Sequence, residues 1–225
     1  MEKMEIRAFN FENIGPDEPV NGRRRLEGRA IVYGSMTNIG PFDEIIERGA
    51  LDETDLKDVR LLLNHNTNGI PLARSRNNNE NSTMQLMPDD DGLAFRADID
   101  IKNNMEAKAL SSAVDRGDLS GMSFMMVGVR DRWENPRSEH PTRHIVGIRK
   151  VLEISAVTFP AYTDTSIENR GNFNALESAM ESLESAKAAE EEEERDALAA
   201  EAAAAEQERR TAVLEWLENY KKGEK

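Results

Sequence analysis

The stretch Gly121-Met122-Ser123-Phe124-Met125-Met126-Val127 decides how the chain folds, because it is apolar on both faces of an extended strand. Side chains alternate along a strand, so Ser123 shares a face with Met125 and Val127 while the residues between them point the other way. A strand that is apolar on both sides is buried on both sides. We therefore expect this strand to be central in a sheet. The turn Leu119-Ser120-Gly121 just before it places Ser123 near a strand end, where a substrate could reach it.

Two other apolar runs carry a polar residue in the same manner. His65 closes Leu61-Leu62-Leu63-Asn64-His65, and Glu153 interrupts Val151-Leu152-Glu153-Ile154-Ser155-Ala156-Val157. A hydroxyl or carboxylate that is buried without a partner costs a few kcal/mol, so these groups need partners. The simplest partners are one another. Serine, histidine and an acid in contact are the parts of an acyl-transfer site.

Each of the three residues also has a purely structural interpretation. A serine at the start of a strand, such as Ser123, often hydrogen-bonds the backbone without any catalytic role. His65 can likewise be a buried imidazole with a purely structural role. Glu153 suits an edge-strand charge or an ion pair with Arg149 or Arg130. The sequence has no Gly-x-Ser-x-Gly elbow that would favour the catalytic interpretation.

Other residues compete for the same roles. Ser120 and Ser155 are alternative nucleophiles, whereas His140 and His144 lie in a polar stretch and are predicted to be loop residues. His65 is therefore the preferred general base, and Glu153 is preferred to Asp98 and Asp100, which alternate with isoleucines as a solvated strand face does.

The first three quarters of the chain show short apolar runs separated by Gly, Pro, Asn and Asp, which is typical of strands and turns. The turn Asp89-Asp90-Asp91-Gly92 predicts a hairpin, without the spaced ligands of a calcium loop. A helix is predicted over residues 104–116, with a Gly117 stop, and a shorter one near Ala50. Strands are predicted at residues 6–11, 26–33, 42–47, 59–64, 83–87, 93–101, 122–133 and 145–159.

Composition limits the possible functions of this 225-residue chain. A net charge of -14 argues against a nucleic-acid-binding surface, since phosphate contacts need clustered Lys and Arg. With no cysteine there is no disulfide, thiol nucleophile or zinc-thiolate site. No run approaches the roughly 18 to 20 apolar residues of a membrane span, and the start of the chain lacks a signal peptide's apolar segment. No cofactor and no metal are expected.

The composition changes near Gly171, where the chain becomes rich in Ala and Glu. From Asn174 onward there are 15 acidic and 7 basic residues, so this segment supplies -8 of the net charge. Strong helix formers dominate it and few large apolar residues are available for a core. We expect one domain over residues 1–170 and a long helical or partly disordered tail over residues 171–225, because the run Glu190-Glu191-Glu192-Glu193-Glu194 repels itself.

Five blocks in this order, spread over residues 6–167, resemble the prohead maturation proteases of tailed bacteriophages. They are Glu27-Gly28-Arg29-Ala30-Ile31-Val32-Tyr33, Asp43-Glu44-Ile45-Ile46-Glu47-Arg48-Gly49-Ala50-Leu51, Leu63-Asn64-His65-Asn66, Leu119-Ser120-Gly121-Met122-Ser123-Phe124 and Glu153-Ile154-Ser155-Ala156-Val157-Thr158-Phe159-Pro160-Ala161-Tyr162.

The resemblance implies a serine endopeptidase related in fold to the herpesvirus assembly proteases. The implied fold class is α+β, a mostly antiparallel β-barrel core wrapped by a few helices. Ser123 is then the nucleophile, His65 the base and Glu153 the third member, with His144 as the alternative because the herpesvirus relatives use a second histidine. Oxyanion stabilisation falls to backbone N–H groups or to an arginine near Ser123.

The resemblance also implies partners and a place of action. Such proteases work in the host cytoplasm inside the immature capsid, where they remove the scaffolding part of the major capsid protein and cleave themselves. The tail then directs incorporation by binding helical scaffold segments, and self-cleavage removes it. The alternatives are a non-catalytic assembly protein with a β-domain and helical tail, and a small-molecule esterase.

Overall fold

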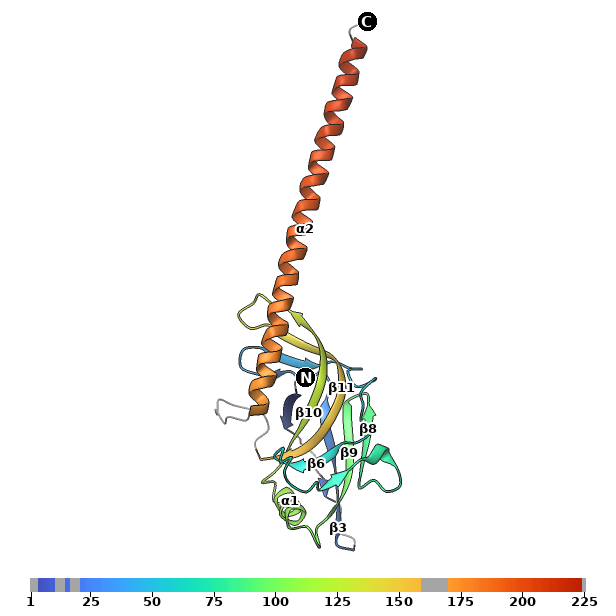
Figure 1. The fold of residues 1–225 in the computed structure, drawn as a ribbon, viewed down its shortest axis with the longest axis vertical. Helices are drawn as coiled ribbons and strands as arrows, with labels where there is room; N and C mark the ends of the chain where they lie inside the picture. The colour runs from blue at the N-terminus through green and yellow to red at the C-terminus, as the bar shows by residue number, and fades with distance from the viewer. Residues whose placement is uncertain (1–3, 11–14, 17–20, 159–169, 224–225) are drawn as a thin grey trace. The chain divides into compact units, whose positions relative to one another are not determined.

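A computed structural model of the chain describes residues 4–10, 15–16, 21–158 and 170–223 (Figure 1). The chain divides into two compact units, Met1–Ser182 and Leu183–Lys225, which are described separately below. The last residues of two predicted strands, Phe11 and Phe159, lie outside the described residues, as does the end of the fifth block, Pro160-Ala161-Tyr162. The fold class is α+β, as expected.

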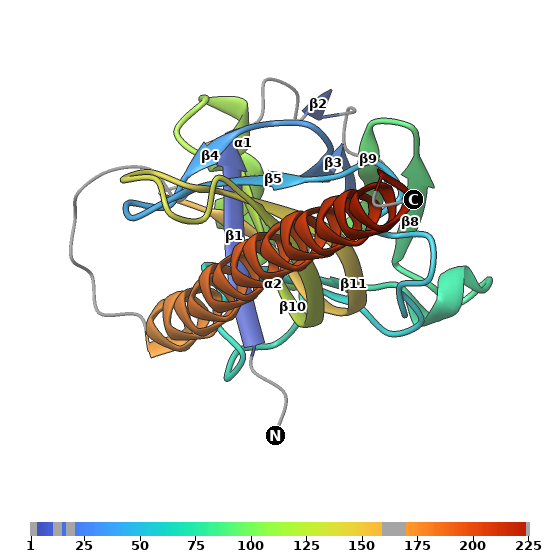
Figure 2. The ribbon, with the colours of Figure 1, turned by 90° about the horizontal axis from the view of Figure 1, so that it is seen from above.

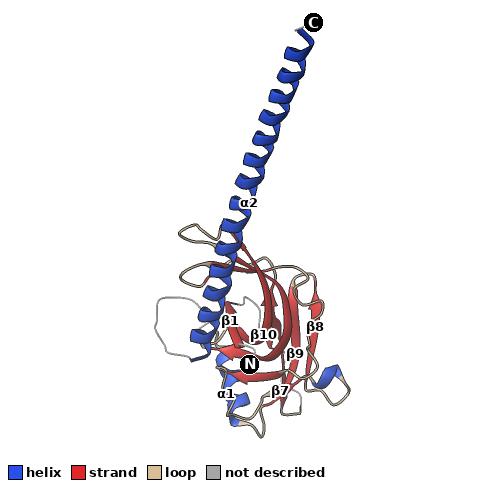
Figure 3. Ribbon diagram, turned by 45° about the horizontal axis from the view of Figure 1, so that its top comes forward, coloured by secondary structure: helices blue, strands red, loops and turns tan. Residues whose placement is uncertain are grey.

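The strands of the first unit form two sheets (Figures 1 and 3). In the seven-stranded sheet the order is β1 (Met4–Asn10), β10 (Gly121–Glu134), β11 (Thr142–Val157), β5 (Asp43–Ile46) and β4 (Thr37–Asn38), with β6 (Arg60–Leu63) between β11 and β7 (Ala73–Arg74). The four-stranded sheet has the order β2 (Gly15–Pro16), β3 (Arg23–Val32), β9 (Gly92–Asp100) and β8 (Met84–Asp89).

The strand that begins at Gly121 is central, as its two apolar faces predicted. β10 pairs antiparallel with β1 on one side and with β11 on the other, and β11 pairs in parallel with β5 and β6. Figure 1 shows β10 and β11 as a long curved pair. Register shifts at Met125/Met126 and at Arg130/Asp131 mark irregularities in this ladder, and such bulges increase the local bend of a strand.

One face of β10 builds the hydrophobic core. Met122, Phe124 and Met126 are buried together with Ile154 of β11 and Leu61 of β6. The same core includes apolar residues of the four-stranded sheet, so it lies between the two sheets; these residues are Leu26, Ile31, Met84, Leu86, Leu93, Phe95 and Ile99. The opposite face of β10 carries Ser123, and it is this face that holds the candidate site.

A closed barrel is not confirmed. Closure needs a continuous ladder from the last strand back to the first. Within the described ranges, however, no strand ladder joins the seven-stranded sheet to the four-stranded one. The strands that the structure describes do pair mostly antiparallel, as expected, and the two parallel pairs are those of β11 with β5 and with β6.

Helix α1 (Met105–Asp115) matches the prediction. Asn104 caps it, its side chain accepting hydrogen bonds from the backbone N–H of Glu106 (2.9 Å) and of Ala107 (3.2 Å). Leu110 and Val114 face the core, and Gly117 (φ 71°) follows the helix end in the left-handed region that glycine favours.

The helix expected near Ala50 is wrong, because residues 48–53 form consecutive turns instead. The backbone carbonyl of Ala50 accepts a hydrogen bond from Ile148 N–H of β11 (2.9 Å), and Gly49 has φ 88°. The tertiary contact with β11 thus holds the carbonyl that would begin an α-helical ladder. A 3-10 turn, η1 (Arg76–Asn78), and the two-residue strands β2, β4 and β7 are further elements that the sequence did not predict.

The predicted hairpin turn at residues 89–92 is confirmed. The side chain of Asp89 accepts hydrogen bonds from the backbone N–H of Asp91 (2.9 Å) and of Gly92 (3.1 Å), and β8 pairs with β9 across the turn. Gly92 has φ 138°, and a Cβ there would lie 2.0 Å from the carbonyl oxygen of Ile31. Only glycine fits this position.

The Ala/Glu-rich segment is one helix, α2 (Arg170–Gly223), of 54 residues. Its first turns belong to the first unit: Ala179 is buried, and Ser182 Oγ accepts from Trp133 Nε1 (3.1 Å) and donates to Asp131 (2.8 Å). Residues 191–217 are all exposed, and Figure 2 shows α2 as one uninterrupted helix. No helix in the described part of the chain is long and apolar enough to cross a membrane.

Five charged side chains form a cluster on the core-facing side of the seven-stranded sheet: Glu5, Arg7, Glu44, Asp131 and Arg143. Arg7 binds Glu44 (2.7 Å) and Glu5 (2.9 Å), and Arg143 binds Glu5 (2.8 Å), Glu44 (3.1 Å) and Asp131 (2.5 Å). Burial acts to lower the pKa of Arg7, but Glu44 and Glu5 outweigh it, so this pKa is raised. The cluster joins strands β1, β5, β10 and β11.

Removing one charge from this cluster is expected to be costly. Glu44→Gln leaves two buried guanidinium groups short of a negative charge and should lower the free energy of unfolding by about 3–5 kcal/mol. The matched control is Glu27→Gln, since Glu27 also pairs with an arginine on the neighbouring strand, Arg96, but is exposed. It should cost less than about 1 kcal/mol. Urea unfolding measures both, and equal effects would contradict the proposed role of the cluster.

Candidate active site

His65 is placed by a turn at the end of β6. The backbone N–H of Asn64 donates to Ala156 (2.9 Å), and then Asn64 (φ 49°) and His65 (φ 55°) both adopt left-handed backbone conformations. Such conformations are uncommon outside glycine and cost on the order of 1 kcal/mol or more each. The Asn64 side chain stabilises the turn by accepting from the backbone N–H of Thr158 (2.9 Å). The turn brings His65 over β11.

His65, Glu153 and Ser155 form a closed ring of hydrogen bonds. His65 Nδ1 lies 2.6 Å from Glu153 Oε1, the Ser155 hydroxyl donates to Glu153 Oε2 (2.5 Å), and the backbone N–H of His65 donates to Ser155 Oγ (3.1 Å). Glu153 is 3% exposed and Ser155 is fully buried. The ring thus satisfies polar groups that burial removes from water, as the sequence argument required.

Ser123 lies directly opposite Ser155 in the β10–β11 ladder. Directly opposed residues of an antiparallel pair have Cα atoms about 4.5–5.5 Å apart and side chains on the same face. The Ser123 hydroxyl donates to the backbone carbonyl of Arg7 on β1 (2.7 Å), and the residue is 0% exposed. Among the described residues, Ser123 and His65 share no hydrogen bond.

The structure therefore places Ser123 and Glu153 on one face of paired strands, and it brings His65, from the turn after β6, into direct contact with Glu153. Glu153 does not sit on an edge strand, because β11 has partners on both sides. Nor is it paired with Arg130, whose guanidinium contacts Glu53 (3.5 Å). Its carboxylate serves His65 and Ser155 instead.

The His65–Glu153 contact determines which ring nitrogen is free. A carboxylate accepts hydrogen bonds, so Nδ1 carries the proton that bonds Glu153, and the other nitrogen of a neutral imidazole is then an acceptor. Within the described ranges Nε2 makes no hydrogen bond. An imidazole held in this way can take a proton from a hydroxyl group and return it.

Two competing serines are separated by their contacts. The Ser155 hydroxyl gives its proton to the acid of the ring and has no contact with the imidazole nitrogen that would act as base. Ser120 is exposed and precedes β10.

The prediction that His144 is a loop residue is wrong. It lies in β11 and is 7% exposed, with Nδ1 2.7 Å from Glu47 and Nε2 3.0 Å from Glu134. At its start β11 pairs with β10 through polar residues. The apolar pattern that predicts a strand therefore does not extend to His144. His144 precedes Glu153 by about 30 Å of strand length. His140 does lie in the turn, next to Asp43 (3.0 Å) and Asn38 (3.1 Å).

No sequence signal points to Arg7, whose backbone carbonyl accepts the Ser123 hydroxyl. A backbone contact leaves no residue-type signature. The guanidinium of the same residue is bound to Glu5 and Glu44. Because its guanidinium is engaged in these ion pairs, Arg7 does not match the arginine expected near Ser123 for oxyanion stabilisation.

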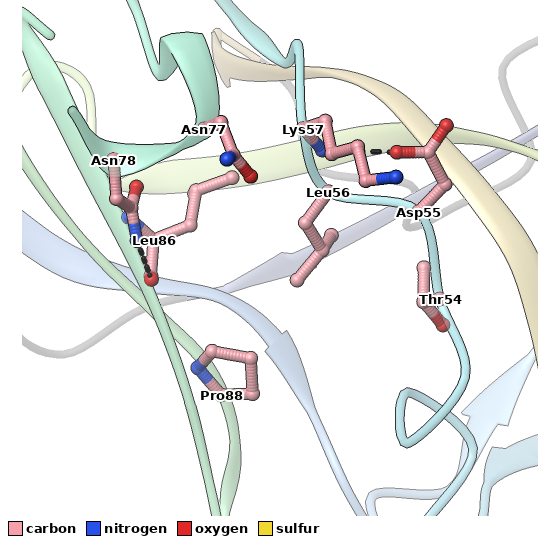
Figure 4. A pocket seen from close by; sticks show the side chains of 8 residues that line it. All are labelled: Thr54, Asp55, Leu56, Lys57, Asn77, Asn78, Leu86 and Pro88. Carbon is pink, nitrogen blue, oxygen red and sulfur yellow. Dashed lines mark hydrogen bonds between the residues drawn. The ribbon is translucent and has the colours of Figure 1, made fainter.

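A surface pocket of about 270 Å³ lies apart from these residues (Figure 4). The Asn78 amide closes one side of it by bonding both backbone groups of Leu86 (2.7 and 3.0 Å). None of the candidate site residues lines it; the lining residues are Thr54, Asp55, Leu56, Lys57, Asn77, Asn78, Leu86 and Pro88. In the described ranges, no group of His, Asp and Glu side chains is arranged to hold a metal ion.

Comparisons with known proteins give two findings. The structure is similar to that of the bacteriophage T4 capsid assembly protease gp21, with a TM-score of 0.42 and 12% sequence identity, over 69% of this chain and 98% of that one. None of the curated proteins matches the chain. A family model described as caudovirus prohead serine protease matches residues 13–181, which ends close to the boundary of the first compact unit at Ser182. This match confirms the resemblance of the five blocks, and the chain belongs to the caudovirus prohead serine protease family, as a protease of capsid maturation.

Proposed function

We propose that the chain is a serine endopeptidase in which Ser123 is the nucleophile, His65 the general base and Glu153 the acid that orients His65. The observation that carries the proposal is the 2.6 Å contact between His65 Nδ1 and Glu153 Oε1, which fixes the tautomer that a base requires. Ser123 stands one strand away on the same face, opposite the serine that completes the hydrogen-bonded ring.

The reaction begins when the Ser123 side chain rotates from the Arg7 carbonyl towards His65. Its oxygen bonds to the carbonyl carbon of the scissile peptide while its proton passes to His65 Nε2, and the carbonyl electron pair moves onto oxygen. The C–N bond then breaks, and the imidazolium gives its proton to the leaving amine. A water molecule cleaves the resulting ester by the same steps, which returns the proton to Ser123.

The described conformation is a resting state in this proposal. Ser123 is fully buried and its hydroxyl is bonded to Arg7, so a substrate carbonyl reaches it only after neighbouring atoms move. Catalytic hydrogen bonds are often absent or long before a substrate binds and form in the complex. A protease at rest until a substrate arrives suits an enzyme that is enclosed together with its substrate.

The substrates follow from the family. We propose that the enzyme acts inside the prohead in the host cytoplasm, on the scaffolding part of the major capsid protein and on copies of itself. Helix α2 is the proposed incorporation segment, since residues 191–217 are exposed and carry more acidic than basic side chains. An exposed helix of this kind is suited to pairing with other helical segments.

Replacing the nucleophile gives the main test. Ser123→Ala should reduce cleavage of co-expressed capsid precursor by at least about 10³-fold, because the change removes the proposed nucleophile. Folding should persist, since the change removes one hydrogen bond worth about 1 kcal/mol. Mass spectrometry reports products, and Ser120→Ala is the matched control with full activity.

Persistent cleavage by Ser123→Ala would refute Ser123 as the nucleophile. It would leave either another serine of the chain, or a non-catalytic assembly protein with a contaminating protease, as the explanation. Hydrolysis of activated esters without cleavage of the precursor would instead indicate an esterase.

The third member of the triad can be tested separately. Glu153→Gln should lower kcat by about 10⁴-fold, because an amide at this position stabilises the wrong tautomer of His65. His144→Gln should change kcat less than tenfold, since its ring contacts Glu47 and Glu134 rather than His65. The reverse pattern, measured on a peptide from the capsid precursor, would transfer the role to His144.

Self-cleavage predicts that α2 is missing from active enzyme. Protein recovered from protease-active particles should lack residues after about Gly171, whereas the Ser123→Ala protein from the same preparation should keep them. Intact-mass measurement distinguishes the two. Active enzyme with its original C-terminus would rule out removal of the tail.

A further inference from the structure

We propose that Ser155 is a positioning residue, which holds His65 and Glu153 in the relative orientation that makes His65 a base. The proposal rests on the triad proposed above and adds a fourth residue to it. The Ser155 hydroxyl makes two hydrogen bonds: it accepts from the backbone N–H of His65 (3.1 Å) and donates to Glu153 Oε2 (2.5 Å). No other described side chain touches both the backbone of the base and the acid.

The hydrogen bond from Ser155 to Glu153 fixes the orientation of the Glu153 carboxylate. The terminal torsion of a glutamate side chain is broad, so a single hydrogen bond to His65 would leave the carboxylate free to turn. Ser155 binds the second oxygen, and the first oxygen then points at Nδ1. Both groups are buried, where such hydrogen bonds are stronger than in water.

The contact with His65 holds a strained backbone. His65 has φ 55°, a conformation that a non-glycine residue keeps only when its surroundings enforce it. The hydrogen bond to Ser155 anchors the amide on one side of the residue, while the Glu153 contact anchors the ring on the other. Without Ser155 the amide loses its partner and the ring is held at one point only.

The position of Ser155 in the sheet explains why this residue can act on both. It pairs with Ser123 on β10 and with Leu62 on β6, so it lies between the strand of the nucleophile and the strand that leads into His65. Glu153 is two residues earlier on the same face of β11. A small hydroxyl here reaches the acid and the turn without separating the strands.

Ser75 provides a matched control because it makes the same kinds of hydrogen bonds elsewhere. It is fully buried, its hydroxyl accepts from the backbone N–H of Val59 (3.0 Å) and it donates to the backbone carbonyl of Leu56 (3.3 Å). Neither partner belongs to the site. Loss of the Ser75 hydroxyl therefore measures the structural cost of removing a buried serine.

The experiment compares Ser155→Ala, Ser155→Thr and Ser75→Ala in the full chain, with kcat and KM measured on a peptide from the capsid precursor. Ser155→Ala should lower kcat by about 10- to 100-fold with KM unchanged, because a small displacement of a catalytic group costs this much. Threonine keeps the hydroxyl and should restore most of the loss. Ser75→Ala should lower stability while kcat stays within about twofold.

A second measurement does not depend on activity. In the Ser123→Ala background, proton NMR of His65 should show a low-field Nδ1–H signal from its bond to Glu153, and adding Ser155→Ala should move that signal upfield or abolish it. An unchanged signal together with unchanged kcat would overturn the proposal. So would an equal loss of kcat in Ser75→Ala, since the effect would then be structural.

The outcomes also separate this proposal from the triad. If Ser123→Ala stays active while Ser155→Ala is dead, Ser155 is itself the nucleophile and the positioning role is wrong. If Ser123→Ala stays active but the Nδ1–H signal still depends on Ser155, the triad fails and the positioning of His65 stands.

Discussion

The pairing of β10 with β11 is the constraint on which the rest of the structure depends. Residues 121–127 of β10 and 151–157 of β11 are nearly all buried, so one face of the pair builds the core between the sheets and the other cannot be left to solvent. Every polar group on these faces therefore needs a partner inside the protein. Ser123, Glu153 and Ser155 satisfy that requirement on one face, and Arg143 with its carboxylates satisfies it on the other.

The two polar clusters meet at Arg7. Its guanidinium belongs to the charged cluster, while its backbone carbonyl accepts the Ser123 hydroxyl. The edge strand β1 is thus held by ion pairs that bridge to β5 and β11, and its Arg7 carbonyl in turn holds the Ser123 hydroxyl. The resting position of Ser123 is consequently set by the same interactions that fix the edge of the sheet.

Much of the fold could be predicted because its longer strands and α1 follow the local pattern of apolar residues. The apolar runs gave the eight longer strands, and the Asn104 cap and Gly117 stop gave α1, since these are local signals. The turns near Ala50 were mistaken for a helix because the hydrogen bond from Ile148 is not local. The start of β11 was missed since His144 is buried by charged partners rather than by an apolar pattern.

The sequence by itself determined the two-faced central strand, the helical tail and the three polar residues that burial obliges to find partners. The resemblance to a protease family then supplied the catalytic roles that we propose for those residues. Only the tertiary structure decided which partners they take: Glu153 meets His65 and Ser155, whereas Ser123 meets a backbone carbonyl on β1. The reason is that strand register and the left-handed turn at His65 arise from contacts between distant segments, which no local pattern encodes.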